Sequence, residues 1–182
     1  RDLVRSRGLG DVYKRQMQMF YGYKTDGVFL TDDEVGDWYD QTAIAKGSKA
    51  GDIRYVDITG DGKVTPDDKT FLGSRIPKYT FGLNFGGEYK GFDFSVLLQG
   101  VAKVKGMLSV YAGHAFYQEG NIQKWQMENC WNVQQDNRYP EYPRLEIMSN
   151  AGSNNTLTSD FWVLDASFLK VRNVQLLSLI HI

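Results

Sequence analysis

The sequence predicts an all-β protein built from antiparallel strands. Between residues 79 and 98, apolar and polar residues alternate with the period of two that is typical of a strand with two different faces. The two alternating runs are joined by the short segment 88–91, which has the length of a tight hairpin connection. With 19 glycines, 11 tyrosines and 10 phenylalanines, the composition favours strands and turns over a helical bundle.

Length and charge exclude several classes of protein. A chain of 182 residues suits one ordinary domain, and a net charge of −1 argues against general binding to nucleic acid. A transmembrane helix is excluded because no apolar stretch of the required length occurs, whereas a transmembrane β-strand gives a much weaker signal and stays open. The single cysteine, Cys130, excludes an internal disulfide framework and a zinc site made of several cysteines.

The two ends differ from the rest of the chain. Residues 1–16 hold five basic residues against two acidic ones, and residues 177–182 read LSLIHI, without charge or pattern. Both ends resemble translated sequencing-adapter read-through, so we expect 1–16 and 177–182 to be non-native and 17–176 to carry the fold. The alternative is a basic arm and a hydrophobic tail.

Outside the hairpin, the sequence predicts a short helix and several further strands. Residues 17–30 indicate a strand with a turn near Asp26-Gly27, and Thr31 with Glu34 has the spacing of a helix capping box, which predicts a helix near 32–45. Residues 102–160 form a long polar stretch without a regular hydrophobic pattern, as is typical of loops. Residues 161–176 predict a last strand, in which a slip of the apolar phase indicates a bulge near Asn173.

The alternating hairpin fits two environments. In a soluble sandwich its apolar face would be the core and its polar face would meet solvent. In a membrane barrel the apolar face would meet lipid and the polar face would line the lumen. The alternation alone does not separate these two structures.

Four stretches together resemble one known family. Residues 22–29 (GYKTDGVF), 51–100, 138–145 (RYPEYPRL) and 159–176 (SDFWVLDASFLKVRNVQL) resemble, in order, the C-terminal barrel region of SusC/RagA-type TonB-linked outer-membrane proteins. The resemblance implies an antiparallel transmembrane β-barrel segment, incomplete at about five or six strands, with long extracellular loops and one short helix. Tyr79, Tyr89 and Phe92 near the strand ends would then fit an aromatic girdle at the membrane surface.

The resemblance also implies a function. It indicates an importer for large nutrients, oligosaccharide or peptide, in the outer membrane of a Gram-negative, Bacteroidetes-like bacterium. Its partners would be outer-membrane lipid, a SusD-like surface lipoprotein and TonB, the last through regions outside this chain. We expect transport without covalent catalysis and therefore no enzyme. The alternative is a soluble, secreted, calcium-bound carbohydrate-binding β-sandwich.

One loop has the spacing of a calcium site. Over 57–68, oxygen-bearing side chains fall at positions 1, 3, 5, 9 and 12 of an EF-hand-type loop, with glycine at position 6 and a backbone carbonyl at position 7. The candidate ligands are Asp57, Thr59, Asp61, Lys63 (through its carbonyl), Thr65 and Asp68, and calcium is the one candidate cofactor. The alternative is a metal-free loop in which aspartates accept hydrogen bonds from local amides.

Four aromatic residues of the long irregular segment are candidate ligand contacts. Trp125, Trp131, Tyr139 and Tyr142 have flat rings that could stack on the C–H faces of sugars. Alternatively, they pack the loops against one another or against a partner. No catalytic residues are expected, because His114 has no acid or nucleophile at a meaningful spacing.

Overall fold

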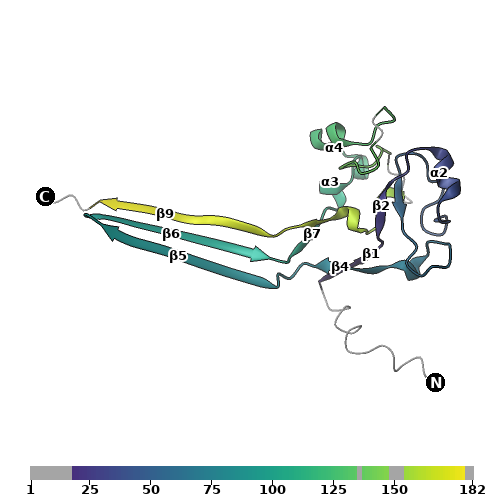
Figure 1. Ribbon diagram of the computed structural model, residues 1–182. Coiled ribbons are helices and arrows are strands. Elements are labelled where there is room, and N and C mark those ends of the chain that lie inside the picture. The colour runs from purple at the N-terminus through teal and green to yellow at the C-terminus, as the bar shows by residue number, and fades with distance from the viewer. Residues whose placement is uncertain (1–17, 135–136, 148–153, 179–182) are drawn as a thin grey trace, which may run out of the picture. The chain divides into compact units, whose positions relative to one another are not determined.

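The computed structural model describes residues 18–134, 137–147 and 154–178 (Figure 1). The chain forms two compact units, each made of two separate stretches. The first unit comprises Arg1–Gly73 and Met107–Leu164, and the second comprises Ser74–Gly106 and Asp165–Ile182. The expected non-native segment 1–16 and residues 179–182 of the expected tail lie outside the described residues.

The second unit contains a sheet of three long antiparallel strands (Figure 1). Strands β5 (Tyr79–Tyr89), β6 (Phe92–Ala102) and β9 (Phe168–Ser178) have 11 residues each and lie in the order β5-β6-β9. β5 and β6 pair without interruption from Tyr79↔Ala102 to Tyr89↔Phe92, which confirms the predicted hairpin. Its two-residue connection, Lys90 and Gly91, has positive φ angles of 51° and 81°, the conformation that hairpins with two-residue loops require.

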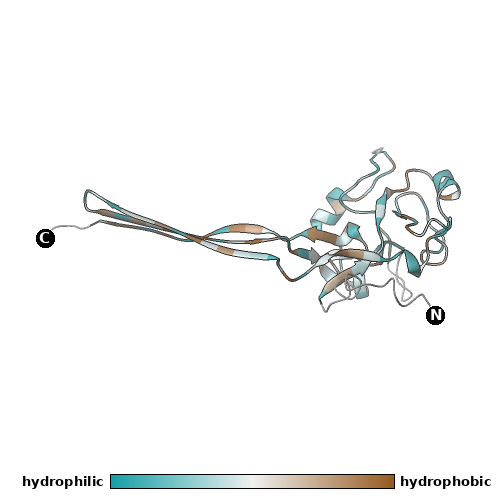
Figure 2. Ribbon diagram, turned by 60° about the horizontal axis from the view of Figure 1, so that its bottom comes forward, coloured by the Kyte–Doolittle hydropathy of each residue, from teal (hydrophilic) through white to brown (hydrophobic). Residues whose placement is uncertain are grey.

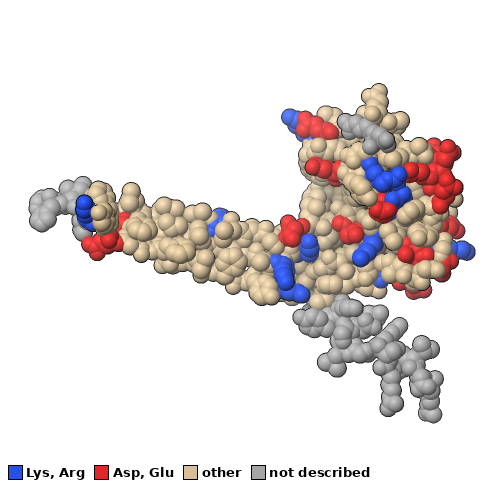
Figure 3. Space-filling model, viewed as in Figure 1, with Lys and Arg blue, Asp and Glu red and all other residues tan. Residues whose placement is uncertain are grey.

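The register gives this sheet one apolar and one polar face. Apolar and polar residues alternate along the long strands (Figure 2), and charged side chains are sparse on the side seen in Figure 3. β5 and β9 are exposed along their whole length, so neither face is covered within the unit. The apolar face carries Tyr79, Phe81, Leu83, Phe85, Tyr89, Phe92, Phe94, Val96, Leu98, Leu169, Val171, Val174 and Leu176. The other face is mostly polar and carries Thr80, Asn84, Glu88, Asp93, Ser95, Gln99, Lys170, Asn173 and Gln175, together with the apolar residues Leu97, Val101, Phe168 and Leu177.

A bulge in β9 keeps the apolar residues on one face. Leu97 pairs with Asn173 and Leu98 pairs with Val171, so Arg172 is the additional residue. This confirms the bulge predicted near Asn173 and explains its sequence signal. Val171 and Val174 are three positions apart, so in a regular strand their side chains would point to opposite faces. The extra residue of the bulge brings both onto the apolar face.

The first unit is built from short elements around a small core. Its strands are β1 (Met19–Gly22), β2 (Thr25–Val28), β3 (Ile53–Tyr55) and β4 (Thr70–Ser74), which form the two-stranded sheets β1-β4 and β2-β3. Strands β7 (Lys105–Met107) and β8 (Val163–Asp165), whose residues are divided between the two units, form another pair. The helical segments are α2 (Asp32–Asp37), η1 (Pro66–Asp68), α3 (Val110–Gly113), η2 (Tyr117–Glu119), α4 (Lys124–Asn129), η3 (Asn154–Thr156) and η4 (Asp160–Trp162).

Two local predictions need correction. The turn expected near Asp26-Gly27 is a register shift inside β2, where Gly27 has a φ of 74°, and the chain leaves β1 at residue 22 instead. The helix expected near 32–45 begins after Thr31, whose side chain accepts from the backbone N–H of Glu34, but α2 ends at Asp37. The Glu34 carboxylate accepts from the backbone N–H of Leu30 instead of completing a capping box with Thr31.

The described residues of 102–160 are largely irregular, as the sequence predicts, and are interrupted by short helical segments, but they are packed into the unit. Ala115, Tyr142 and neighbouring residues pack into a core with Tyr23, Ala45, Ile53, Tyr55, Val64 and Trp162. Three ion pairs join distant parts of the unit: Arg54 with Asp26, Arg138 with Glu34 and Arg144 with Asp52. Arg138 and Arg144 belong to this stretch and attach it to α2 and to the residue before β3.

The strand count also differs from the prediction. Instead of about five or six barrel strands, the described residues contain three strands of 11 residues and six strands of three to five residues. These strands do not close into a barrel within the described part of the chain. No helix among the described residues has the length and hydropathy needed to span a membrane.

Candidate functional site

The first unit contains a cavity of about 510 Å³, within the range of known ligand pockets. Four aromatic rings dominate its lining, and a single carboxylate, that of Glu141, is among the lining groups. The lining residues are Thr25, Gly27, Leu108, Trp125, Tyr139, Pro140, Glu141, Phe161, Trp162 and Leu164.

Short helical segments hold three of the four rings. Trp125 lies in the first turn of α4, where Gln123 and Gln126 form a capping box, and its indole N–H donates to the side-chain oxygen of Gln123 at 2.6 Å. Phe161 and Trp162 lie on η4, and the Trp162 indole N–H donates to the Asn155 carbonyl at 2.8 Å. Because both indole N–H groups are already bonded within the chain, the rings offer mainly apolar surface.

Tyr142 supports this aromatic wall from the core. Its ring meets Trp125 edge-on at 5.7 Å and Trp162 edge-on at 5.6 Å, and Trp162 meets Phe161 at 5.1 Å. The Tyr142 hydroxyl accepts from the backbone N–H of Ala115 at 2.8 Å. Burial raises the pKa of Tyr142, so this hydroxyl stays protonated at neutral pH.

Tyr139 forms the exposed side of the cavity. It is 67% exposed, and its hydroxyl donates to Asp26 Oδ1 at 3.0 Å. The preceding residue, Arg138, accepts from the backbone N–H of Val28 through its carbonyl and forms an ion pair with Glu34 at 2.7 Å. Both contacts attach the segment that carries Tyr139 to β2 and α2.

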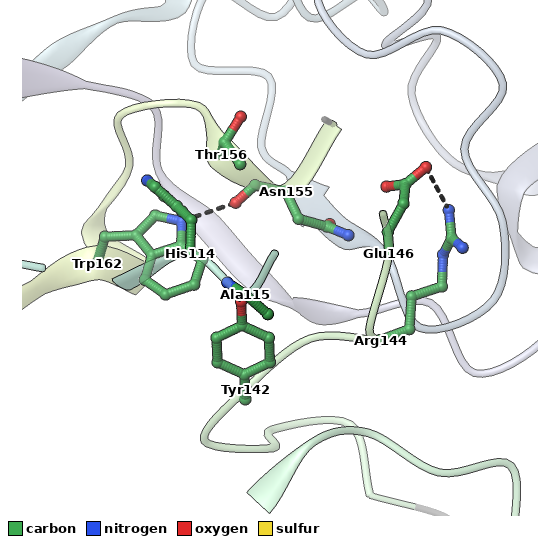
Figure 4. A pocket seen from close by; sticks show the side chains of 8 residues that line it. All are labelled: His114, Ala115, Tyr142, Arg144, Glu146, Asn155, Thr156 and Trp162. Atoms are coloured by element: carbon green, nitrogen blue, oxygen red, sulfur yellow. Dashed lines mark hydrogen bonds and ion pairs between the residues drawn. The ribbon is translucent and has the colours of Figure 1, made fainter. Parts of the chain in front are cut away.

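A second, polar pocket lies around His114 (Figure 4). Its volume of about 10 Å³ gives room for one water molecule. His114 packs edge-on against Trp162 at 5.1 Å, its buried Nδ1 has no hydrogen-bond partner among the described residues, and burial lowers the pKa of His114. This pocket is too small for a nutrient, whereas the aromatic cavity has the volume of a ligand pocket, and we take that cavity as the candidate functional site.

Of the four aromatic residues that the sequence suggests as ligand contacts, the structure places two in the lining of the cavity. Trp125 and Tyr139 line the cavity, Tyr142 is buried behind it, and Trp131 packs against Gly51, outside the lining. Gly51 has a φ of 85°, and a Cβ there would overlap the Trp131 ring. Contact of these residues with a ligand stays a prediction.

Sequence reasoning missed half of the aromatic lining. Phe161 and Trp162 were expected to begin a strand, whereas they lie on η4. Their adjacency to Trp125 and Tyr139 depends on contacts between segments more than 20 residues apart, which no local pattern shows. The one available signal was the Phe-Trp pair itself, because large aromatic residues dominate binding surfaces.

The predicted calcium loop is held by its own amides. Asp57 accepts from the backbone N–H groups of Gly60 and Gly62 at 2.7 and 2.8 Å, and Asp61 accepts from that of Lys63 at 2.9 Å. Asp68 is buried and accepts from three backbone N–H groups. The loop thus has the hydrogen bonds expected of the metal-free alternative.

Asp68 is the most strongly bonded carboxylate of this loop. Burial would raise the pKa of Asp68, but the backbone N–H groups of Thr65, Thr59 and Ile58, at 2.7, 2.8 and 2.9 Å, lower it to about 2. Both carboxylate oxygens of Asp68, at position 12 of the motif, therefore already accept hydrogen bonds from backbone N–H groups. Among the described residues, no group of three or more histidine, cysteine or acidic side chains is placed to hold a metal ion. Calcium binding stays a prediction, which a calcium titration of the unfolding temperature would test.

Comparison with known proteins relates the chain to one class of receptor. No protein-family model matches it. Two curated proteins of Formosa agariphila, TonB-dependent receptor P26 and TonB-dependent receptor P3, are each 26% identical to it over 183 aligned residues, covering 96% and 95% of the chain. The chain spans 17% of the length of each of these relatives.

The chain is thus a relative of TonB-dependent receptors along nearly all of its length and corresponds to a part of them. This confirms the resemblance inferred from the sequence at the level of TonB-linked receptors. It does not favour the alternative of a calcium-bound β-sandwich.

Proposed function

We propose that the chain is part of the transmembrane barrel of a SusC/RagA-type, TonB-dependent importer in the outer membrane of a Gram-negative, Bacteroidetes-like bacterium. The complete receptor imports a large nutrient, oligosaccharide or peptide, without covalent catalysis. A SusD-like lipoprotein covers its outer opening, and TonB supplies energy through other parts of the receptor.

The long sheet is the observation that carries this proposal. Its three strands have 11 residues each, and a tilted strand of about 9–11 residues crosses the hydrocarbon core of a membrane. Both faces are uncovered within the unit, one of them apolar and the other polar. A barrel wall needs this arrangement, because lipid covers one face and the lumen covers the other.

The connections of the strands suggest the orientation of the segment. β5 and β6 are joined by two residues, whereas β6 and β9 are separated by a stretch that includes part of the first unit. Outer-membrane barrels have short periplasmic turns and long extracellular loops. We therefore place Lys90 in the periplasm and Tyr139 outside the cell.

Chemical labelling in whole cells tests this orientation. In the complete receptor with Cys130→Ser, we introduce Lys90→Cys or Tyr139→Cys separately and add a maleimide that does not cross membranes. The cysteine at position 139 should react in intact cells, and the one at position 90 only after the outer membrane is permeabilised. Equal labelling at both positions in intact cells would contradict the proposal.

Uptake tests the transport function itself. A strain without the complete receptor is compared with the complemented strain for growth on a panel of oligosaccharides and peptides as sole nutrients. Growth on at least one nutrient should require the receptor, and disruption of TonB should cause the same loss. Unchanged growth on the whole panel, with the receptor expressed in the wild type, would argue against import.

A further inference from the structure

We propose that the aromatic cavity of the first unit binds an organic cation, the ammonium or guanidinium group of a ligand, against the faces of its rings and the carboxylate of Glu141. This inference rests on the proposed import function and narrows its substrate. The same ammonium chemistry occurs in lysine-containing peptides and in oligosaccharides of unacetylated amino sugars.

The lining of the cavity supplies the two features that bind organic cations. Trp125, Tyr139 and Phe161 present aromatic surface, and Trp162, which is 3% exposed, packs against Phe161. Tryptophan and tyrosine faces attract cations most strongly. Glu141 adds a negative charge, and no lysine or arginine is among the residues that line the cavity. Glu141 is exposed and makes no ion pair within the described part of the chain.

Two further carboxylates accept hydrogen bonds from residues of the lining. Asp26 accepts from the Tyr139 hydroxyl, and Asp160 accepts from the backbone N–H and the hydroxyl of Thr25 at 2.9 and 2.6 Å. A hydroxyl that donates to a carboxylate makes its own ring more electron-rich, which strengthens the attraction of the Tyr139 face for a cation.

The nearby cations of the protein do not neutralise Glu141. Arg54 pairs with Asp26, and Arg138 pairs with Glu34 through two bonds of 2.7 and 3.3 Å. Each guanidinium is therefore engaged by another carboxylate. An anionic ligand would meet Glu141 with no lysine or arginine in the lining to bind it, so uronates and sulfated sugars are disfavoured.

Calorimetric binding to the complete receptor in detergent tests the inference with matched ligands. The glucosamine trimer and the N-acetylglucosamine trimer have the same rings, but only the first carries ammonium groups. Trilysine and its side-chain-acetylated form make the same comparison for peptides. We expect each cationic ligand to bind at least fivefold more tightly than its acetylated partner, and the tighter of the two cations identifies the source of the natural ligand.

Two substitutions locate the binding. Glu141→Gln keeps the size of an exposed side chain and should weaken cation binding about fivefold, as expected for the loss of one partly exposed charge interaction. Glu119→Gln, an exposed glutamate outside the cavity lining, serves as the matched control and should change nothing. Trp125→Leu should weaken binding further through loss of the ring face.

The outcomes separate this inference from the proposed function. Equal or tighter binding of the acetylated ligands, or equal effects of the two glutamine substitutions, would overturn the cation site. Receptor-dependent growth in the uptake experiment would still support import in that case. Loss of the cation preference in Glu141→Gln alone would support the site whether or not the uptake assay succeeds.

Discussion

At the scale of single residues, Asp68 shows how a buried charge stabilises the first unit. Its carboxylate accepts from the backbone N–H groups of Ile58, Thr59 and Thr65, and its pKa is lowered to about 2. Since the folded pKa lies below the ordinary value of 3.8, this contribution to stability is complete above about pH 4. It is lost as the pH falls from about 4 towards 2.

We predict that Asp68→Asn lowers the free energy of unfolding of the first unit by about 2 kcal/mol at neutral pH, because bonds to a charged acceptor are lost. Asp67→Asn, at an exposed neighbouring carboxylate, should have little effect. Denaturant unfolding in detergent measures both, and tryptophan fluorescence reports the first unit, since all 4 tryptophans lie in it. Equal losses in the two variants would show that the amide bonds of Asp68 contribute nothing.

The residues of the 57–68 loop could be predicted from the sequence, whereas most residues that line the cavity could not. The spacing of Asp57, Asp61 and Asp68 located a folded loop correctly, because the acceptors and the amides that they bind lie within 12 residues of one another. Glu141 and Phe161 were not predicted as site residues, since their place in the cavity lining depends on neighbours that only the folded chain brings together.

At the scale of elements, the hairpin connection is the local feature that fixes the register of β5 and β6. Gly91 has a φ of 81°, in the left-handed region where a Cβ costs about 1–2 kcal/mol. We predict that Gly91→Ala accelerates hydrogen exchange of the amides that join Tyr89 and Phe92. Gly82→Ala, within β5 and without positive φ, is the control and should leave exchange unchanged. Unchanged exchange in both variants would mean that the turn does not limit pairing.

The two faces of β5 allow a second test at this scale. Leu83 lies on the apolar face and Asn84 lies on the polar face, at neighbouring positions in the middle of the strand. If lipid covers the apolar face, Leu83→Arg should cost about 2–4 kcal/mol and reduce the amount of complete receptor in the outer membrane. Asn84→Arg introduces the same side chain towards the lumen and should assemble normally. Quantitative immunoblots of membrane fractions distinguish the two, and equal assembly would contradict the barrel.

Long elements were predictable from the sequence, and short ones were not. In β5, β6 and β9 every second residue reports the same face, so 11 residues give a repeated signal, and even the bulge at Arg172 was visible as a change of phase. The short strands β2 and β3 have four and three residues, and they depend on Asn155, whose side-chain oxygen accepts from the backbone N–H of Ile53 across 102 positions. Contacts between residues so far apart in the chain produce no periodic pattern in the sequence.

At the scale of the whole molecule, the two units have different solvent requirements. The first unit has a buried core around Tyr55 and Trp162 and needs no apolar medium to cover it. The long sheet buries little of its apolar face and has unpaired edges at β5 and β9 within the described residues. Uncovered apolar faces and free strand edges promote association in water.

The state of the 182-residue chain in solution therefore discriminates between the two readings of the alternating strands. We predict that the chain aggregates in aqueous buffer and becomes monodisperse in detergent micelles, because detergent covers the face that carries Phe81, Leu83 and Phe85. Size-exclusion chromatography with light scattering measures both states. Arginine substitutions on that face, Leu83→Arg with Phe85→Arg, should reduce the amount of bound detergent, whereas Asn84→Arg should not. A soluble monomer that binds no detergent and unfolds cooperatively would instead support a water-soluble sandwich, and the barrel proposal would fail for this chain.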